Sequence, residues 1–451
     1  MTSTVTLIHV RLQALDRWAV GVIPDADATV KLPTAINPGT GRPHIPGTSL
    51  AGSLKRHLPA ESTWLGDDPA GWEERTGDIP RHRSPLAILG ATVLNAGIQS
   101  RGSTAIDPRR RAALGVTLRE EQWVEPGPID VIMQHDGPRD QDLVDQLLSW
   151  RPIIGRAGSS GLGRAVPTSV RTVSLDLTQA EHLRWWLSTR HTWYAAPTTT
   201  ACPKDTAQTD PDPKDAGSGD TDAEPAWDVG REVLRVAWRA VDPIHVGDHE
   251  GSRGGDDQPL DPTTALKKLA SIARTMRLRD RVLVPGSSWK GVYRHRVAHI
   301  TTVIGMAGGE SQRLCDVLFG SLSRSGLLRF ADTTAPASVL TLTHVSIDRF
   351  TGGALDGGLF TVEAIKPGTE LVQSITTERD LPPEVVALLT HVACDLHDGL
   401  IGIGGHTTRG YGSVAAATAQ EAKRLRDTAH PLSVEALATA LETLESGGGT
   451  R

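Results

Sequence analysis

Hydrophobic and polar residues alternate in two stretches of the chain, residues 4–12 (TVTLIHVRL) and residues 233–241 (VLRVAWRAV). A period of two residues predicts a strand with one buried face. The apolar side chains that share a face are Ile8, Val10 and Leu12 in the first stretch, and Leu234, Val236 and Trp238 in the second. Each half of the chain is therefore predicted to open with a half-buried strand.

The same order of features follows each strand. A Pro-Gly turn predicts the start of a helix at residues 44–58 (HIPGTSLAGSLKRHL) and again at 283–297 (LVPGSSWKGVYRHRV). Residues 103–127 and 344–368 then share Ile-Asp, a basic residue, a glycine-containing gap, an acid-containing strand and a terminal Pro-Gly. A helix leading into a glycine-rich loop closes each half, at 155–163 (GRAGSSGLG) and 404–412 (GGHTTRGYG). Corresponding features lie about 240 residues apart, so the chain is predicted to be an internal duplication.

The segment between the two halves has a different composition. It is rich in Pro, Asp, Gly and Thr and holds no large apolar residue from 203 to 225. Such a segment cannot bury enough surface to offset its ordering entropy. We predict a first domain at 1–197, an acidic flexible linker at 198–228, a second domain at 229–417 and a helical tail at 418–451. The tail is two amphipathic pieces broken by Pro431, and Trp185, Trp186 and Trp193 are expected to pack on the first domain.

Composition indicates a soluble globular protein. The chain has 451 residues, 38% hydrophobic and 22% charged, which suits two domains. Its three cysteines, Cys202, Cys315 and Cys394, cannot form a disulfide framework, and neither a signal peptide nor a membrane-spanning run is predicted, so we expect a cytoplasmic protein.

The net charge of −6 argues at first against a nucleic-acid partner. Residues 204–228 hold eight acids and two lysines, that is 2 − 8 = −6. The rest of the chain is therefore neutral overall and can carry basic faces. The acids of this segment are Asp205, Asp210, Asp212, Asp215, Asp220, Asp222, Glu224 and Asp228.

The two helix starts are candidate phosphate sites. A helix N-terminus with Ser or Thr at its cap presents free amides and the positive end of the dipole. Basic residues follow in both copies, although a capped helix with a solvated basic face is the alternative. The repetition favours phosphate binding by Ser49, Lys55 and Arg56 in the first half, and by Ser287, Ser288, Lys290 and Arg294 in the second.

The glycine-rich loops are the second candidate. Glycine permits positive φ and close backbone approach to phosphate. The loops lack the Gly-Lys-Ser/Thr ending of a nucleotide-binding P-loop, and no Lys/Arg-Gly-Phe stacking signature is present. An extended polyanion read through its backbone fits better. The predicted contacts are Arg156 and Arg164, then Gly404, Gly405, Thr408, Arg409 and Gly410.

The motifs PGSSWKG, VSIDRFTGGALDGGLFTVE and GIGGHTTRGYG resemble the RAMP superfamily of CRISPR-associated proteins, and in particular the backbone subunits of type III complexes. The second half resembles them from about 233 to 415, and the first half less tightly from about 4 to 169. The resemblance implies an α+β fold of two tandem ferredoxin-like, RNA-recognition-type domains, each with a hairpin thumb. It also implies guide RNA, single-stranded target RNA and other type III effector subunits as partners, with no membrane.

In that family the thumbs kink the duplex of guide and target RNA. The resemblance places the thumbs of this chain at residues 348–360 and 107–118. It gives RNA contacts to Arg349 and to the run Arg109, Arg110 and Arg111, for which exposed turn charge is the alternative.

Target cleavage is an open hypothesis. The family places a catalytic Asp in the loop after the first strand, where this chain has Lys31 and Arg274. Nearby acids could substitute, because paired carboxylates can hold Mg²⁺ or Mn²⁺ beside a phosphate. The candidates are Asp248, Asp256 and Asp257, with Glu250 and Asp261 in the same loop, and Asp25 and Asp27 in the first half.

Three alternatives remain open. His391, Cys394 and His397 could suggest zinc, but their helical spacing favours ordinary helix residues. His406 could serve as the general base of a stand-alone RAMP guide-processing endoribonuclease. A RAMP-derived protein without a CRISPR role is the third.

Overall fold

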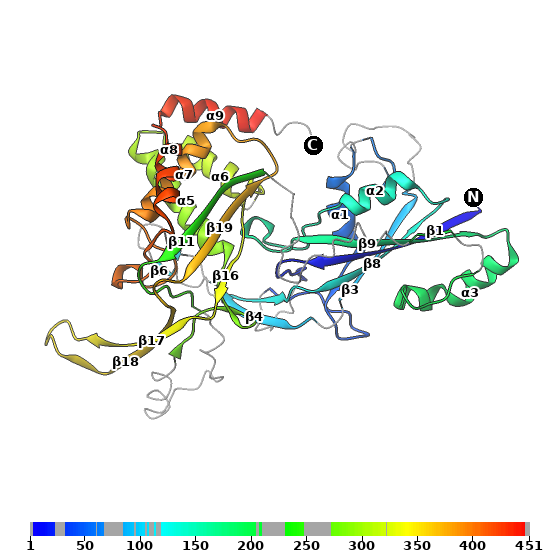
Figure 1. Ribbon diagram of the computed structural model, residues 1–451, viewed down its shortest axis with the longest axis horizontal. Helices are drawn as coiled ribbons and strands as arrows, with labels where there is room; N and C mark the ends of the chain where they lie inside the picture. The colour runs from blue at the N-terminus through cyan, green and yellow to red at the C-terminus, as the bar shows by residue number, and fades with distance from the viewer. Residues whose placement is uncertain are drawn as a thin grey trace. The chain divides into compact units, whose positions relative to one another are not determined.

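The computed structural model describes residues 3–22, 32–59, 61–66, 84–93, 96–103, 106–107, 112–113, 119–203, 207–209, 231–247, 272–321 and 323–446. The chain divides into two compact units (Figure 1). The first contains residues 1–99, 122–158 and 163–227. The second contains residues 228–451 together with two short pieces, 100–121 and 159–162.

The first unit is built on one antiparallel sheet of six strands, in the order β10-β9-β1-β8-β3-β2. The long strand β1 lies between β9 and β8, and its Ile8 faces Thr172 on one side and Met133 on the other. The strands are β1 (Thr4–Ala14), β2 (His44–Ile45), β3 (Leu86–Val93), β8 (Pro128–His135), β9 (Ala165–Asp176) and β10 (Ala207–Thr209).

Helices contact both faces of this sheet. On one face, Ile8, Val10 and Leu12 are buried in a core that includes residues of α1 (Gly47–His57) and α2 (Gln141–Ser149). On the other face, β1 packs through Val5 and Leu7 in a cluster with Trp193 of α3 (Ala180–Ala195). Trp185 and Trp186 are partly buried against the same cluster, which confirms the expected packing of the three tryptophans.

The second unit contains an antiparallel sheet of four strands, in the order β15-β19-β11-β20. Leu234, Val236 and Trp238 of β11 are buried in its core, as the alternation predicts. The strands are β11 (Arg231–Ala240), β15 (Leu328–Phe330), β19 (Glu370–Thr377) and β20 (Val414–Ala416). The helices are α5 (Gly286–Val303), α6 (Gly308–Phe319) and α7 (Pro383–His397).

The two sheets have the same connectivity. In the first unit the chain passes through β1, α1, β3, β8, α2 and β9, and the strands lie in the order β9-β1-β8-β3. In the second it passes through β11, α5, β15, β19, α7 and β20, and the order is β20-β11-β19-β15. Both are α+β arrangements with the first strand inside the sheet, and the elements follow one another in the same order.

Further strands of the second unit form smaller sheets. A long hairpin of β17 (Val339–Ile347) and β18 (Ala354–Ile365) extends away from its helices (Figure 1). The strand β12 (Ile272–Ala273) adds to this hairpin in parallel, and β13 (Arg277–Leu278), β14 (Arg281–Val284) and β16 (Thr333–Pro336) form a three-stranded sheet.

Short strands occupy the corresponding part of the first half. The pairs are β4 (Ile98–Ser103) with β7 (Arg119–Val124), and β5 (Ile106–Asp107) with β6 (Ala112–Ala113).

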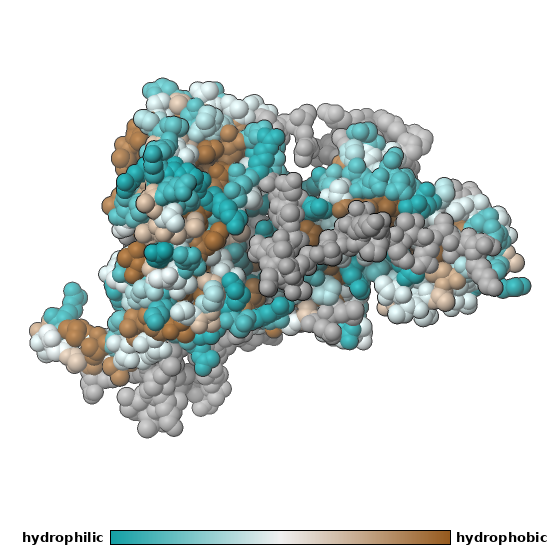
Figure 2. All heavy atoms as spheres, in the orientation of Figure 1, coloured by the Kyte–Doolittle hydropathy of each residue, from teal (hydrophilic) through white to brown (hydrophobic). Residues whose placement is uncertain are grey.

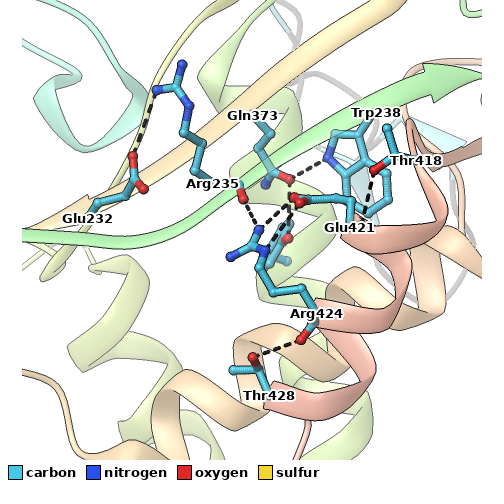
Figure 3. A network of polar contacts seen from close by, with 9 residues as sticks. Glu232, Arg235, Trp238, Gln373, Thr418, Glu421, Arg424 and Thr428 are labelled. Atoms are coloured by element: carbon cyan, nitrogen blue, oxygen red, sulfur yellow. Dashed lines mark hydrogen bonds and ion pairs between the residues drawn. The ribbon is translucent and has the colours of Figure 1, made fainter.

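The tail forms two helices, α8 (Ala419–Thr428) and α9 (Val434–Ser446). Figure 3 shows how α8 is attached to β11: Arg424 pairs with Glu421 and donates to the carbonyl of Arg235. Thr418 caps α8 by accepting a hydrogen bond from the amide of Glu421 at 3.1 Å. Because apolar residues of both helices belong to the buried core of the second unit, the tail is part of that unit.

Two details differ from the sequence prediction. Pro46 and Pro285, not Ser or Thr, are the N-caps of α1 and α5, and neither helix has a side-chain cap. Proline has no amide to satisfy and its φ suits a helix start, so the hydroxyl residues fall inside the first turn. Within the predicted linker, Ala207–Thr209 pair with the open edge of β9, while residues 204–206 and 210–228 lie outside the described residues. Among the helices that the structure describes, none is long and apolar enough to cross a membrane.

Candidate nucleic-acid interface

The glycine-rich loop at residues 404–412 is held by close backbone contacts. The amide of Gly405 donates to the His245 carbonyl at 2.7 Å, and that of Gly412 donates to the Pro243 carbonyl at 2.9 Å. Gly404 has φ +86°, and a Cβ there would lie 2.4 Å from the His245 oxygen. Only glycine fits such an approach, so this residue fixes the path of the loop.

The loop at residues 155–163 has corresponding backbone hydrogen bonds and positive-φ positions. Arg156 donates its amide to the Ala19 carbonyl at 2.9 Å, and Gly163 donates to the Arg17 carbonyl at 2.8 Å. A Cβ on Gly155 would lie 1.9 Å from the Ala19 oxygen. Positive φ occurs at corresponding positions of the two loops: Gly155, Ala157, Gly161 and Gly163 in the first, and Gly404, His406, Gly410 and Gly412 in the second.

The two loops differ in what their side chains contact. In the second loop, Thr408, Arg409 and Gly410 are exposed, as are Gly404 and Gly405. In the first, the Arg156 guanidinium donates to the carbonyls of Leu32 and Gln122 at 2.8 and 2.9 Å. It also lies 4.7 Å from the centre of the Trp123 ring.

Arg164 is engaged in a similar way. It forms a bidentate ion pair with the buried Asp16, at 2.5 and 2.8 Å. Such a pair fixes geometry as well as charge. The two arginines of the first loop thus bind the protein itself, whereas Arg409 of the second loop presents its charge to solvent.

The start of α1 is open to solvent. Ser49 and Arg56 are exposed, and Lys55 is one of the residues around a surface hollow of about 290 Å³ beside Gly47 and Thr48. His57 is tied to α2 through the Gln146 carbonyl at 3.0 Å. The first helix therefore keeps two of its predicted phosphate contacts, Ser49 and Arg56, at the surface.

The polar groups at the start of α5 are hydrogen-bonded to other parts of the protein. Its first amide, on Gly286, donates to the Asp332 carboxylate at 2.8 Å, and Lys290 donates to the Ser159 hydroxyl at 2.7 Å within the second unit. Burial, reinforced by the charge of Arg294, lowers the pKa of Lys290 to about 8. Ser287 is exposed and Ser288 half-buried.

Arg294 is also turned toward the protein. It donates to the Gly320 carbonyl at 2.6 Å and to Asp316 at 2.9 Å. The cations predicted to bind phosphate at α5, Lys290 and Arg294, are therefore hydrogen-bonded to groups of the second unit itself.

The turn of the β17–β18 hairpin is shaped by Asp348. Its carboxylate accepts hydrogen bonds from the amides of Phe350 and Thr351 at 3.0 and 2.7 Å. These bonds to Thr351 and Phe350 lower the pKa of the Asp348 carboxyl. Arg349 is exposed, and Phe350 is 90% exposed.

Large apolar side chains gather on this hairpin near its turn. Figure 2 shows hydrophobic residues on the hairpin that projects from the second unit in Figure 1. They are Val345, Ile347, Phe350, Leu355 and Leu359, and each is exposed. A ribbon with an apolar surface and an arginine at its tip can insert between stacked bases as well as contact their backbone.

A cluster of rings beside the second loop could not be found from the sequence, apart from His406. It consists of His245, His344, Phe360, His406 and Tyr411, and the Tyr411 hydroxyl lies 2.5 Å from His344 Nε2. Its members come from four separate places in the chain and share no local spacing. Only the fold brings them together.

Several predicted residues lie outside the described residues: Arg109, Arg110, Arg111, Asp25, Asp27, Lys31, Asp248, Glu250, Asp256, Asp257 and Asp261. Arg274 is described and exposed. Among the described residues, no three His, Cys, Asp or Glu side chains are grouped so that they could hold a metal ion.

The histidines of α7 serve as structural contacts. His391 Nε2 lies 2.8 Å from the His430 carbonyl, and His397 Nδ1 accepts the Ala416 amide at 3.1 Å. Burial raises the pKa of the Cys394 thiol. This geometry agrees with the interpretation of these residues as ordinary helix residues.

An α+β unit with an exposed, cationic glycine-rich loop is suited to binding a polyanion. Residues 239–415, from the end of β11 to β20, match the RAMP superfamily, and the chain therefore carries a RAMP superfamily domain in this range. RAMP proteins bind CRISPR RNA. No curated protein matches the chain.

Proposed function

We propose that this chain is an RNA-binding backbone subunit of a type III CRISPR ribonucleoprotein. In this role it holds guide RNA and kinks the duplex that the guide forms with single-stranded target RNA. It also contacts other subunits of the effector complex. Both units take part, so that one chain supplies two consecutive backbone positions.

The repeated glycine-rich loop carries this proposal. Loops 155–163 and 404–412 share their positive-φ positions and their hydrogen bonds to the segment after the first strand. The second loop lies inside the RAMP domain. A backbone fixed so closely in two places supports one binding mode used twice.

The connectivity supports two tandem ferredoxin-like domains. In each unit a strand, helix, strand, strand, helix and strand follow one another, and the fourth strand lies beside the first. This is the arrangement of RNA-recognition-type domains. The domain of the second unit includes the RAMP match.

We assign the thumb of the second unit to the β17–β18 hairpin. Its tip combines Arg349 with the exposed Phe350. In the proposed complex, the arginine contacts phosphate and the apolar side chains separate bases where guide and target RNA are kinked. The paired strands β4 and β7 support a similar role for the first half.

Co-expression with a CRISPR array tests the function directly. The purified protein should carry RNA of a defined length. Arg409→Glu should reduce the amount of bound RNA severalfold, because it reverses a charge on the exposed loop. Arg184→Glu, the same change on exposed α3, is the matched control and should retain RNA. Protein free of RNA in both wild type and control would contradict the proposal.

A stand-alone guide-processing endoribonuclease is the second candidate. The ring cluster favours it, because His406 lies beside His344 and Tyr411, and such groups can transfer protons. Incubation of precursor RNA with chelator distinguishes the two functions, since this enzyme would cut without metal and a backbone subunit would leave the RNA intact. A RAMP-derived protein outside CRISPR would show no preference for array RNA.

A further inference from the structure

The ring cluster links the glycine-rich loop of the second unit to its hairpin. His344 of β17 contacts Tyr411 of the loop at 2.5 Å and stacks on Phe360 of β18, with ring centres 5.3 Å apart. The His406 ring lies 5.6 Å from that of Tyr411 and 5.5 Å from that of His245. Three imidazoles thus meet within one small region.

Charges of one sign surround His406. Burial lowers its pKa, and the charges of His245, Arg409 and His344 lower it further. A proton on the His406 imidazole is therefore disfavoured until a negative charge arrives.

Glu363 is the acid on the strand packed against the cluster. Its carboxylate pairs with Arg277 at 3.1 Å and accepts the Thr275 amide at 3.2 Å. Its carbonyl accepts the Nδ1–H of His245 at 2.7 Å. Because this carboxylate is already bound to Arg277, an anion from outside is the stronger counter-charge for a protonated His406.

The cluster can be reached from solvent. His344 and His406 are half-buried and Arg409 is exposed, whereas His245 is buried. His406 also adopts a left-handed backbone, with φ +58°. This conformation is uncommon for a side chain larger than glycine, and the loop retains it at the position where the imidazole meets the cluster.

We propose that His406, supported by His344 and Arg409, is a proton-linked contact for a phosphodiester of bound RNA. The site takes up a proton when the phosphate arrives, so that RNA affinity rises as the pH falls. This inference rests on the proposed RNA-binding function and adds to it a regulation by pH. The first loop has Ala157 at the corresponding position, so the linkage belongs to the second unit.

Linkage fixes the direction of the effect. A phosphate raises the pKa of a neighbouring imidazole, so the complex binds more protons than the free protein between the two pKa values. The phosphodiester stays ionised throughout this range. For one proton taken up, affinity rises by at most about tenfold for each unit of pH lowered within this window.

The test uses the full chain and a labelled single-stranded RNA, in two unrelated sequences, at constant ionic strength. Fluorescence anisotropy is measured from about pH 8.5 to about pH 5.5, the range over which histidine changes charge. The wild type should bind RNA at least about fivefold more tightly at about pH 5.5 than at about pH 8.5. Calorimetry in buffers of different ionisation enthalpy should show proton uptake on binding.

Variants locate the proton. His406→Asn keeps a residue that tolerates the left-handed backbone, and it should remove most of the pH dependence. His391→Gln alters a histidine on α7 that bonds a backbone carbonyl and should leave the slope unchanged. Arg409→Gln should weaken binding at every pH while the slope remains.

Two outcomes would overturn the inference and leave the proposed function standing: RNA affinity independent of pH in the wild type, or a slope that survives in His406→Asn. RNA cleavage that depends on His406 would assign proton transfer to the cluster instead. A folded protein that binds no RNA at any pH would contradict the proposed function itself. Proton uptake by the wild type keeps the test decisive if a variant fails to fold.

Discussion

Ala157 and His406 occupy corresponding positions in the two glycine-rich loops, 155–163 and 404–412. Each has a left-handed backbone, with φ of 61° and 58°, and each lies two residues after a glycine packed against a carbonyl, Gly155 and Gly404. The two loops share this backbone conformation but carry different side chains. The chemistry available to each loop therefore depends on the side chains that this backbone carries.

Glycine substitutions in the loop at residues 404–412 measure how much stability depends on its backbone conformation. Gly404→Ala should cost about 3 kcal/mol of unfolding free energy, because its Cβ would lie 2.4 Å from the His245 oxygen at φ +86°. Gly410→Ala is the matched control, since it has φ +80° but no atom within 4 Å, and should cost about 1 kcal/mol. Urea denaturation gives both values. Equal costs would show that the close contact is relieved by movement of the loop.

Lys290 gives the second unit a pH-dependent stability. Its pKa is lowered from 10.5 to about 8 in the folded protein, so the unfolded chain binds more protons between these values. Stability should therefore rise with pH from about 8 to about 10.5, and the cost of burying the ammonium is fully present below pH 8.

The comparison with Lys290→Met isolates this effect. Between about pH 7 and about pH 10, the wild type should gain about 1–2 kcal/mol of unfolding free energy relative to the variant. Lys423→Met, an exposed lysine of α8, is the control. If the unfolding free energies of the wild type and Lys290→Met differed by the same amount at every pH in this range, Lys290 would have the same pKa in the folded and the unfolded chain.

The sequence predicted the repeating parts of the structure well. Alternation placed Leu234, Val236 and Trp238 in the core, because a period of two decides which face of a strand is buried. The Pro-Gly turns marked the starts of both helices. These features depend on neighbours in sequence.

The candidate site was harder to predict. Arg156 and Lys290 carry charge in the expected motifs, but the acceptors that bind them, the Gln122 carbonyl and the Ser159 hydroxyl, lie 34 and 131 residues away. His245 and His344 show no pattern that would connect them to Tyr411. Contacts between distant segments depend on tertiary packing, which spacing along the chain does not record.

The hairpin tip should act on RNA shape more than on stability. Phe350→Ala should change the unfolding free energy by less than about 0.5 kcal/mol, because the side chain is 90% exposed. A fluorescent adenine analogue in the target should report less unstacking when the duplex forms on this variant. Val303→Ala, an exposed apolar residue of α5, serves as the control, and equal fluorescence in both variants would contradict the role of Phe350.

The acidic segment should weaken RNA binding through its charge. Residues 210–225 hold six acids and one lysine, that is 1 − 6 = −5. Replacing them with a short Gly/Ser segment retains β10 and should leave the melting temperature of both units nearly unchanged. RNA binding should tighten at low salt and return to the wild-type affinity as salt screens the repulsion. A large fall in melting temperature would show that the segment is structural.

If the protein cuts target RNA, the reaction should need Mg²⁺ or Mn²⁺ and the acids of the second-half loop. Lys31 and Arg274 stand where the resemblance expects an aspartate, so neighbouring carboxylates must hold the metal. Asp256→Ala with Asp257→Ala should then abolish one cleavage product. Binding of guide and target should be retained, because removing acids does not weaken attraction for phosphate. Asp25→Ala with Asp27→Ala is the matched control in the first half and should change little.

Cleavage that survives chelation and fails only in His406→Asn would assign the reaction to the ring cluster. Tight binding without cleavage under any of these conditions would make the chain a scaffold, with Lys31 and Arg274 as the reason.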